Sequence, residues 1–167
     1  MADIENLTDL FIRKLRRVYD AEQRLMKTLP QLRDAASSRD LKAAFLAHFE
    51  ETEAHVDRLE RVFELFNEKP DADTCHSIKG AIKDGDDAVK LDAEPAVKDA
   101  ALIAAAQDAE HIEIAMYGTL RTWAATLKQL EAAHALEWTL EEEKAVDKRL
   151  TGIAEELNFR AAASQER

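Results

Sequence analysis

The sequence predicts an all-α protein that folds as a single bundle of four long helices. Apolar residues recur at steps of three and four along four segments, and no segment shows the alternating pattern of a β-strand. Only four Gly and three Pro occur among the 167 residues, which leaves few sites for the many turns of a β-sandwich. The length suits one domain, residues 1–167, with one sizeable core.

Two helices are predicted in the first half of the chain, over about residues 4–36 and 40–67. Pro30 should bend the first helix late or end its regular part, because proline lacks a backbone N–H. The apolar stripe of the first helix comprises Leu7, Phe11, Leu15, Val18, Leu25, Leu29 and Leu32. The stripe of the second comprises Leu41, Phe45, Phe49, Thr52, Val56, Leu59, Phe63 and Phe66.

A long crossover is predicted over residues 68–94. Its start is polar, and it contains one short helical segment, Ser77 to Lys90, interrupted by Gly80 and Gly85. The crossover is long enough to return along a helix of ~45 Å, the length of about 30 residues at 1.5 Å each.

Two more helices are predicted over about residues 95–127 and 131–158. Pro95 suits the first turn of the earlier one. A tight connection falls around residues 128–131, and residues 160–167 have the composition of a frayed tail. Two short-looped hairpins joined by one long crossover make a four-helix bundle of the ferritin-like type, in which the second and third long helices point the same way.

The charge balance limits the classes of partner. The chain has 34 acidic and 23 basic residues, a formal net charge of −11, which disfavours nucleic acid and anionic lipid and favours cations. The start of the chain lacks the basic and apolar regions of a signal peptide, and no run approaches the ~18 apolar residues of a membrane span. We therefore expect a cytoplasmic protein that binds neither nucleic acid nor membrane. A single Cys excludes an internal disulfide framework.

Acidic residues occupy the inward face of three predicted helices. Burying one uncompensated carboxylate costs several kcal/mol, and neighbouring carboxylates also repel one another. Since Lys and Arg fall almost entirely on the polar faces, a bound divalent cation is the simplest compensation. The inward acids are Glu22, Glu110, Glu113, Glu143 and Asp147.

Counting residues from the predicted turns indicates that these acids meet at one level of the bundle. A turn near residue 38 places Glu22 opposite position 54. A turn near residue 129 places Glu110 and Glu113 opposite positions 148 and 145, which adjoin Glu143 and Asp147. The acids of the first, third and fourth long helices are therefore predicted to form one cluster.

In the second helix the same count selects Glu51 and His55, which are four residues apart and can share a metal ion. Three further residues of this helix are weaker candidates for ligands. Glu50 and Glu53 project further from the apolar stripe, and His48 faces inward but lies about two turns from the level of the acids.

Four segments of the chain, residues 46–52, 99–107, 110–119 and 139–147, resemble the YciE/YciF-like bacterial stress proteins, a ferritin-like family. The resemblance spans nearly the whole chain, and the block from Glu110 to Thr119 is its most specific part. It implies a dimer of rubrerythrin-like bundles, a di-iron or ferroxidase site and induction under stress.

The resemblance also assigns ligand positions. Two positions depart from the rubrerythrin pattern: Asp147 stands where a His is usual, and the second helix has Thr52-x-x-His55 rather than Glu-x-x-His. The positions that match the rubrerythrin pattern directly are Glu22, Glu110, Glu113 and Glu143.

These observations lead to the hypothesis of a di-metal carboxylate protein of the stress response, with iron or manganese, that acts as a ferroxidase or as an oxygen- or peroxide-reactive oxidoreductase. Manganese catalase-like peroxide removal is one alternative. A non-enzymatic stress protein with a structural or degenerate metal site is a second one. The predicted metal ligands are Glu22, Glu51, His55, Glu110, Glu113, Glu143 and Asp147.

Tyr117 lies one helical turn beyond Glu113 on the same face, where it could donate a hydrogen bond to a ligand or pass an electron. A buried tyrosine with a polar partner is the simpler interpretation. The sequence has no rubredoxin-like Cys cluster, so a reductase, if one is needed, is an external partner. We expect the protein to be a homodimer.

Overall fold

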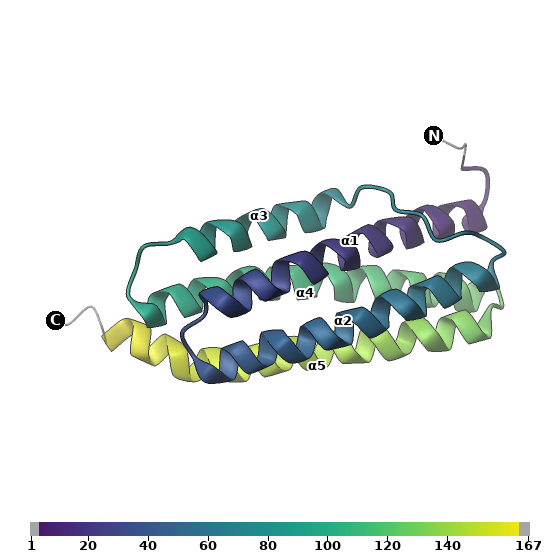
Figure 1. Ribbon diagram of the computed structural model, residues 1–167. Coiled ribbons are helices and arrows are strands. Elements are labelled where there is room, and N and C mark those ends of the chain that lie inside the picture. Colours follow the sequence, from purple (N-terminus) through teal and green to yellow (C-terminus); the bar gives the residue numbers. More distant parts are fainter. Residues whose placement is uncertain (1–3, 164–167) are drawn as a thin grey trace.

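The structure is a computed structural model that describes residues 4–163 of the chain. Within that range it contains five α-helices and no strand, which confirms the all-α class (Figure 1). The helices are α1 (Leu7–Ala35), α2 (Arg39–Leu65), α3 (His76–Lys90), α4 (Pro95–Thr126) and α5 (Leu130–Ala163).

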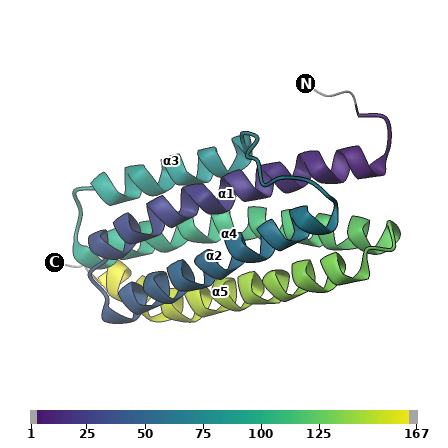
Figure 2. The same cartoon turned by 45° about the vertical axis from the view of Figure 1, so that its right-hand side comes forward.

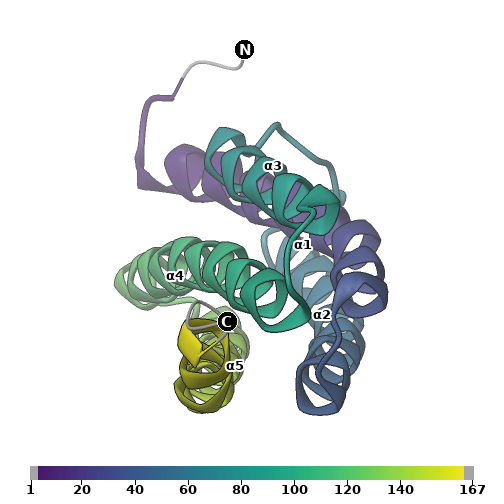
Figure 3. The same ribbon diagram turned by 90° about the vertical axis from the view of Figure 1, so that its left-hand side faces the viewer.

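The four long helices, α1, α2, α4 and α5, form a bundle that Figure 3 shows almost end on. α1 and α2 make one antiparallel hairpin and α4 and α5 make the other, with their short loops at opposite ends of the bundle (Figure 1). The crossover returns the chain along the bundle, so α2 and α4 run in the same direction. α3 lies in the crossover and packs on α1 and α4, outside the bundle (Figure 2).

Local signals in the sequence set the starts of the helices. The Asn6 side chain accepts a hydrogen bond from the Asp9 amide at 3.0 Å and the Asp9 carboxylate accepts one from the Asn6 amide at 3.2 Å, a capping box before α1. Ser38 caps α2 by accepting from the Leu41 amide. Pro95 occupies the first turn of α4, where no helical hydrogen bond needs its missing N–H.

α2 and α4 end in the same geometry. Asn67 and Lys128 follow these helices with φ values of 56° and 61°, in the left-handed region. The amides of the next residues, Glu68 and Gln129, donate to carbonyls in the last turn at 3.0 and 2.9 Å. This is the Schellman pattern, which satisfies terminal carbonyls and turns the chain away from the helix axis.

Pro30 does not end α1, which continues to Ala35, close to the predicted end at residue 36, because proline removes only one backbone donor while the residues around it remain packed in the core. Two other predictions are corrected. α3 runs unbroken through both of its glycines. α5 extends to Ala163 rather than residue 158, so residues 160–163 are helical and not a frayed tail; residues 164–167 of the predicted tail lie outside the described residues.

One hydrophobic core joins the two hairpins. At one end of the bundle, Asp99 of α4 accepts hydrogen bonds from the Ser37 amide, the Ser37 hydroxyl and the Ser38 amide at 2.7, 2.6 and 2.8 Å, which ties α4 to the α1–α2 loop. The largest fully buried side chains include Phe11, Leu15, Leu41, Phe45, Phe63, Ile78, Leu102, Ile103, Tyr117, Leu120 and Leu136.

Among the described helices, none has a segment long and apolar enough to cross a membrane.

Candidate metal centre

Six glutamate and histidine residues lie in the middle of the bundle, and each residue has at most 2% of its surface exposed. All four long helices contribute to this set, which we call the acid–histidine cluster. Its members are Glu22 of α1, His48 and His55 of α2, Glu110 and Glu113 of α4, and Glu143 of α5.

Helical spacing explains why these polar side chains face inward. Glu22 lies four residues after Val18 and three before Leu25, and both of these apolar side chains are buried. Glu143 likewise lies three residues after the buried Leu140. The glutamates thus occupy positions that the local periodicity assigns to the core, as predicted for the inward acids.

The cluster consists of two groups that share one glutamate. In each group, one ligand-type atom of every member lies within 4.8 Å of those of the others. The first group is Glu22, His55 and Glu143. The second group is His48, Glu110, Glu113 and Glu143. Because Glu143 belongs to both, the geometry suits two cations linked by one carboxylate.

In the first group, His55 Nδ1 lies 3.4 Å from Glu22 Oε1 and 3.1 Å from Glu143 Oε1. On the opposite side of the ring, His55 Nε2 lies 3.0 Å from Glu142 Oε2, and that oxygen accepts a hydrogen bond from Arg58 Nη1 at 2.8 Å. An Nε2–H that donates to Glu142 leaves Nδ1 of a neutral ring as the electron-pair donor. Histidines that bind metals typically have such a carboxylate behind the ring.

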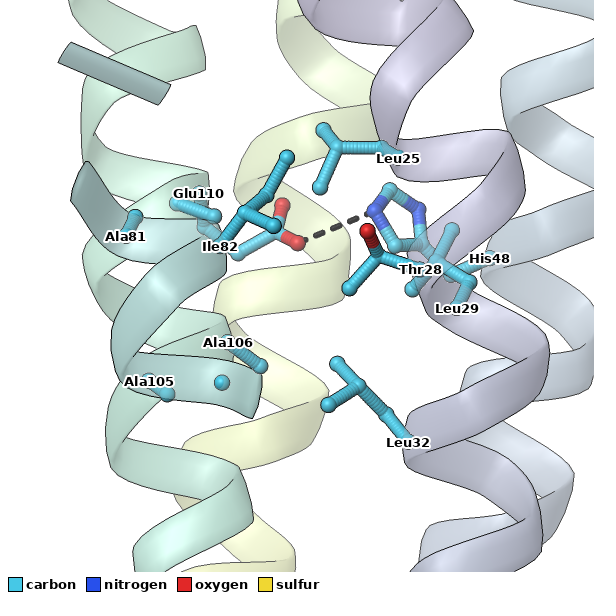
Figure 4. A pocket seen from close by; sticks show the side chains of 12 residues that line it. Leu25, Thr28, Leu29, Leu32, His48, Ala81, Ile82, Ala105, Ala106 and Glu110 are labelled. Atoms are coloured by element: carbon cyan, nitrogen blue, oxygen red, sulfur yellow. Dashed lines mark ion pairs between the residues drawn. The ribbon is translucent and has the colours of Figure 1, made fainter. Parts of the chain in front are cut away.

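In the second group, His48 Nε2 lies 3.0 Å from Glu110 Oε1 (Figure 4). The second ring nitrogen, Nδ1, lies 3.9 Å from Glu51 Oε2. Both histidines therefore direct one nitrogen at the cluster. The hydrogen bond to Glu142 fixes the His55 ring with Nδ1 toward the cluster. His48 directs Nε2 at Glu110, and its Nδ1 is buried without a hydrogen-bond partner among the described residues.

Tyr117 lines the cluster without adding charge. The Tyr117 hydroxyl donates a hydrogen bond to Glu22 Oε1, and its ring meets the His55 ring edge-on with 6.2 Å between centroids. Burial and the Glu22 carboxylate raise the pKa of Tyr117 well above its usual value, so the phenol remains a donor. Thr52 is fully buried, and its hydroxyl has no hydrogen-bond partner among the described residues.

Burial and crowding change the protonation of the cluster in the absence of a cation. Burial, together with the charges of Glu143 and Glu22, raises the pKa of Glu113 well above its usual value. Burial also raises the pKa of Glu143 to about 8, although the hydrogen bond with His55 opposes this shift.

The same carboxylates also shift the pKa values of the two histidines. Burial alone would lower the pKa of both rings, but the adjacent glutamates outweigh burial and raise the pKa of His48 to about 9 and that of His55 to about 11. The metal-free cluster therefore holds protons near neutral pH that a bound cation would displace.

The donor set fits divalent metal ions. In the described part of the chain, no Lys or Arg side chain forms an ion pair with any of the four cluster glutamates. Carboxylate oxygen and imidazole nitrogen are ligands that iron and manganese both accept. Several buried oxygens have no hydrogen-bond partner and are free to coordinate: Glu22 Oε2, Glu110 Oε2, Glu143 Oε2 and both oxygens of Glu113.

Two predicted ligands, Glu51 and Asp147, lie outside both groups. The Glu51 side chain is 31% exposed and lies behind the His48 ring. Asp147 accepts a hydrogen bond from Gln107 at 3.0 Å and lies 3.3 Å from His111 Nε2. Its side chain is one methylene shorter than that of glutamate, and it remains on the flank of α5.

His48 enters the cluster in place of Glu51. The count from the turns placed it two helical turns off level, but the structure shows a cluster that extends along the bundle axis, with His48 and His55 two turns apart. Glu50 and Glu53, the weaker candidates on the same helix, are exposed. Glu142 was not predicted, since nothing in the sequence distinguishes it from the exposed Glu141 beside it.

Fold and site define a class: an all-α bundle whose core holds four glutamates and two histidines. Residues 6–163 match the family described as "Domain of unknown function (DUF892)", and the chain belongs to this family. It is 42% identical to protein YciF of Escherichia coli (strain K12) over 153 residues, which cover 91% of this chain and 92% of YciF. The resemblance to YciE/YciF-like proteins is thereby confirmed.

Solved structures agree with this assignment. The crystal structure of the E. coli stress protein YciF matches with a TM-score of 0.89 and 41% identity, covering 92% of this chain and 98% of that one. YcfI from Rhodopseudomonas palustris matches with a TM-score of 0.86 and 40% identity, covering 90% and 96%. A protein from Xanthomonas campestris, 18% identical with a TM-score of 0.77 over 97% of this chain and 100% of that one, shares the fold.

Proposed function

We propose that the acid–histidine cluster binds two divalent metal ions, iron or manganese, and that the protein is a di-metal carboxylate oxidoreductase that reacts with dioxygen or peroxide. The observation that carries this proposal is the burial of four glutamates without any Lys or Arg partner in the described chain. Such a set is destabilising unless protons or cations neutralise it. The single long crossover supports the proposal, because ferritin-like bundles that hold di-metal sites have this connectivity.

The two groups suggest how the ligands divide. One ion would be held by Glu22 and His55 and the other by His48, Glu110 and Glu113, while Glu143 would be shared. Six side chains for two ions leave coordination positions for small molecules.

Two Fe(II) ions held by these residues would supply the two electrons that, together with two protons, reduce dioxygen to hydrogen peroxide. The surrounding side chains have separate tasks. Glu142 holds His55 with Nδ1 toward the cluster, and Tyr117 holds Glu22 through one carboxylate oxygen. Helices on all sides exclude bulk water from the cluster.

The partners of this activity are also proposals. The relative from E. coli is described as a stress protein, which suits a role in removing reactive iron or oxidant. An external reductase would return oxidised ions to the reduced state, because the lone Cys75 is buried and cannot form a redox-active Cys pair. We propose a homodimer as the assembly, and the mass of the particle in solution tests this.

The test combines metal analysis with turnover. Protein purified without added metal is loaded with Fe(II) under anaerobic conditions, the bound metal is counted, and dioxygen uptake is then recorded. We expect about two ions per chain and oxygen consumption that depends on them. Metal without turnover would support a structural site instead, and turnover with peroxide and Mn(II) alone would support manganese catalase-like chemistry.

Glu113→Gln and Glu53→Gln form a matched pair for this test. Both replace one carboxylate by an amide on a long helix, but Glu113 is buried in the cluster and Glu53 is exposed. Glu113→Gln should abolish binding of at least one ion and leave the metal-free protein as stable as before or more stable, since it removes a repelling buried acid. Glu53→Gln should change neither property.

A further inference from the structure

A small cavity lies between α1, α3 and α4 and ends at the His48–Glu110 pair (Figure 4). Its volume is about 20 Å³. A space of this size admits one small uncharged molecule and excludes a hydrated metal ion or an organic reductant. The crossover helix forms one wall, so α3 covers this side of the cluster.

The walls of the cavity are apolar almost throughout. α1 contributes leucines, and α3 and α4 contribute Gly85 and small alanines. The Thr28 hydroxyl, the one polar side-chain group on the wall away from the pair, donates its proton to the Arg24 carbonyl at 3.1 Å. Charged or strongly hydrogen-bonding molecules therefore find no partners until they reach His48 and Glu110.

We infer that this cavity is the binding site from which dioxygen reaches the metal centre, with α3 as its outer wall. The inference rests on the proposed function and names the oxidant. Dioxygen is small and apolar, so the alanine and leucine walls accept it without unsatisfied hydrogen bonds. Hydrogen peroxide, which needs hydrogen-bond partners, is disfavoured by the same walls.

Gly85 offers a direct way to close the cavity. A side chain added at this position would meet Leu32 Cδ2 at 3.5 Å, an ordinary contact distance, and would grow into the space between α3 and α1. Gly80, one and a half turns earlier on the same helix, is exposed, and a side chain added there meets nothing within 4 Å. The same substitution at either glycine therefore replaces a glycine of α3, but only the substitution at Gly85 fills the cavity.

Xenon is the probe for the cavity, because it binds apolar cavities and needs no metal. Crystals of the full-length protein, metal-free, are pressurised with xenon and examined by anomalous scattering. We expect xenon among Leu29, Ala81 and Ala106, and we expect it to be lost in Gly85→Leu but kept in Gly80→Leu. Gly85→Ala, which adds one methyl group, should reduce xenon occupancy and covers the case in which Gly85→Leu does not fold.

The second readout is the rate at which the Fe(II)-loaded protein is oxidised. Gly85→Leu should slow oxidation by dioxygen about tenfold and leave oxidation by hydrogen peroxide unchanged, whereas Gly80→Leu should alter neither rate. Absence of xenon from the cavity would overturn the inference. So would an unchanged dioxygen rate in Gly85→Leu, or an equal slowing of both oxidants.

The two proposals fail in different ways. If the protein binds neither iron nor manganese, the proposed function is wrong and the dioxygen assignment falls with it, whether or not xenon binds. If iron binds and dioxygen oxidises it at the same rate in Gly85→Leu and Gly80→Leu, the proposed function stands and the inference about the cavity is wrong.

Discussion

His55 donates through Nε2 to Glu142 at 3.0 Å while its Nδ1 faces the cluster glutamates. Glu142 is held in turn by Arg58, which also donates a hydrogen bond to Thr139 at 2.5 Å. Burial would raise the pKa of Glu142, but Arg58 outweighs it and the pKa is lowered, so the carboxylate stays charged. A charged acceptor behind the ring gives His55 a fixed orientation.

The first prediction concerns this acceptor. Glu142→Gln removes its charge and should weaken metal binding by about 10–100-fold, because the His55 ring loses the partner that orients it. Calorimetric titration of the metal-free protein with Mn(II) measures the change in metal affinity. Glu141→Gln is the control, since Glu141 is exposed and pairs with Lys144 instead. Equal affinity in the two variants would show that Glu142 has no positioning role.

The second prediction separates ligands from neighbours on α5. Asp147→Asn should retain two ions per chain, because Asp147 is engaged by Gln107 and His111 outside the cluster. Glu143→Gln should lose both ions or bind them far more weakly, because Glu143 belongs to both groups. Elemental analysis of the two purified variants gives the ratio of metal to protein. Loss of an ion in Asp147→Asn would place that residue among the ligands.

The third prediction concerns pH. The pKa of His48 rises from 6.5 to about 9 in the folded metal-free protein, so its stabilising effect is full below pH 6.5 and is lost as the pH rises through 9. The raised pKa of Glu143, about 8, acts in the same direction, because the folded state binds the extra proton. The metal-free protein should therefore have a lower Tm at pH 9 than at pH 6.5.

Bound metal should reverse this fall of the Tm with rising pH. Since coordination requires deprotonated ligands, Mn(II) affinity should rise with pH over the same interval, by about tenfold per pH unit for each proton released. Thermal scans with and without Mn(II) across pH 6.5–9 compare the two forms. A metal-free Tm that increases with pH throughout would contradict the proton content inferred for the cluster.

The fourth prediction compares two tyrosines with the same kind of hydrogen bond. Tyr117 donates to the buried Glu22, and Tyr19 donates to Glu60 at 2.7 Å nearer the surface. Tyr117→Phe should cost about 1–3 kcal/mol and weaken metal binding, because it leaves a buried carboxylate without its donor. Tyr19→Phe should cost about 1 kcal/mol or less and leave metal affinity unchanged. Denaturant unfolding and Mn(II) titration measure both effects, and equal metal affinities would exclude a role for Tyr117.

Much of the fold and the acids of the site could be predicted because they depend on helical periodicity. Glu22 interrupts an apolar stripe at its centre, and a buried acid at such a position is visible from spacing alone. Pro95 and the polar loops mark helix ends through local chemistry. The structure accordingly places the predicted glutamates of α1, α4 and α5 in one cluster.

The ligands from α2 could not be fixed in this way. Counting from a turn gives the level within one hairpin, but the cluster joins two hairpins and extends over two helical turns, from His48 to His55. Spacing also does not report how far a side chain reaches. Glu51 lies on the flank beside the His48 ring, and Glu142 is reached only because His55 turns its Nε2 atom outward.

The most direct test of the di-metal centre is anomalous diffraction from crystals grown with Fe(II) or Mn(II), recorded at the absorption edge of the metal. We expect two peaks inside the bundle, one beside Glu22 and His55 and one beside His48, Glu110 and Glu113, with Glu143 between them. A structure with no metal inside the bundle, and with the four glutamates protonated or paired with Lys or Arg, would contradict the proposed centre.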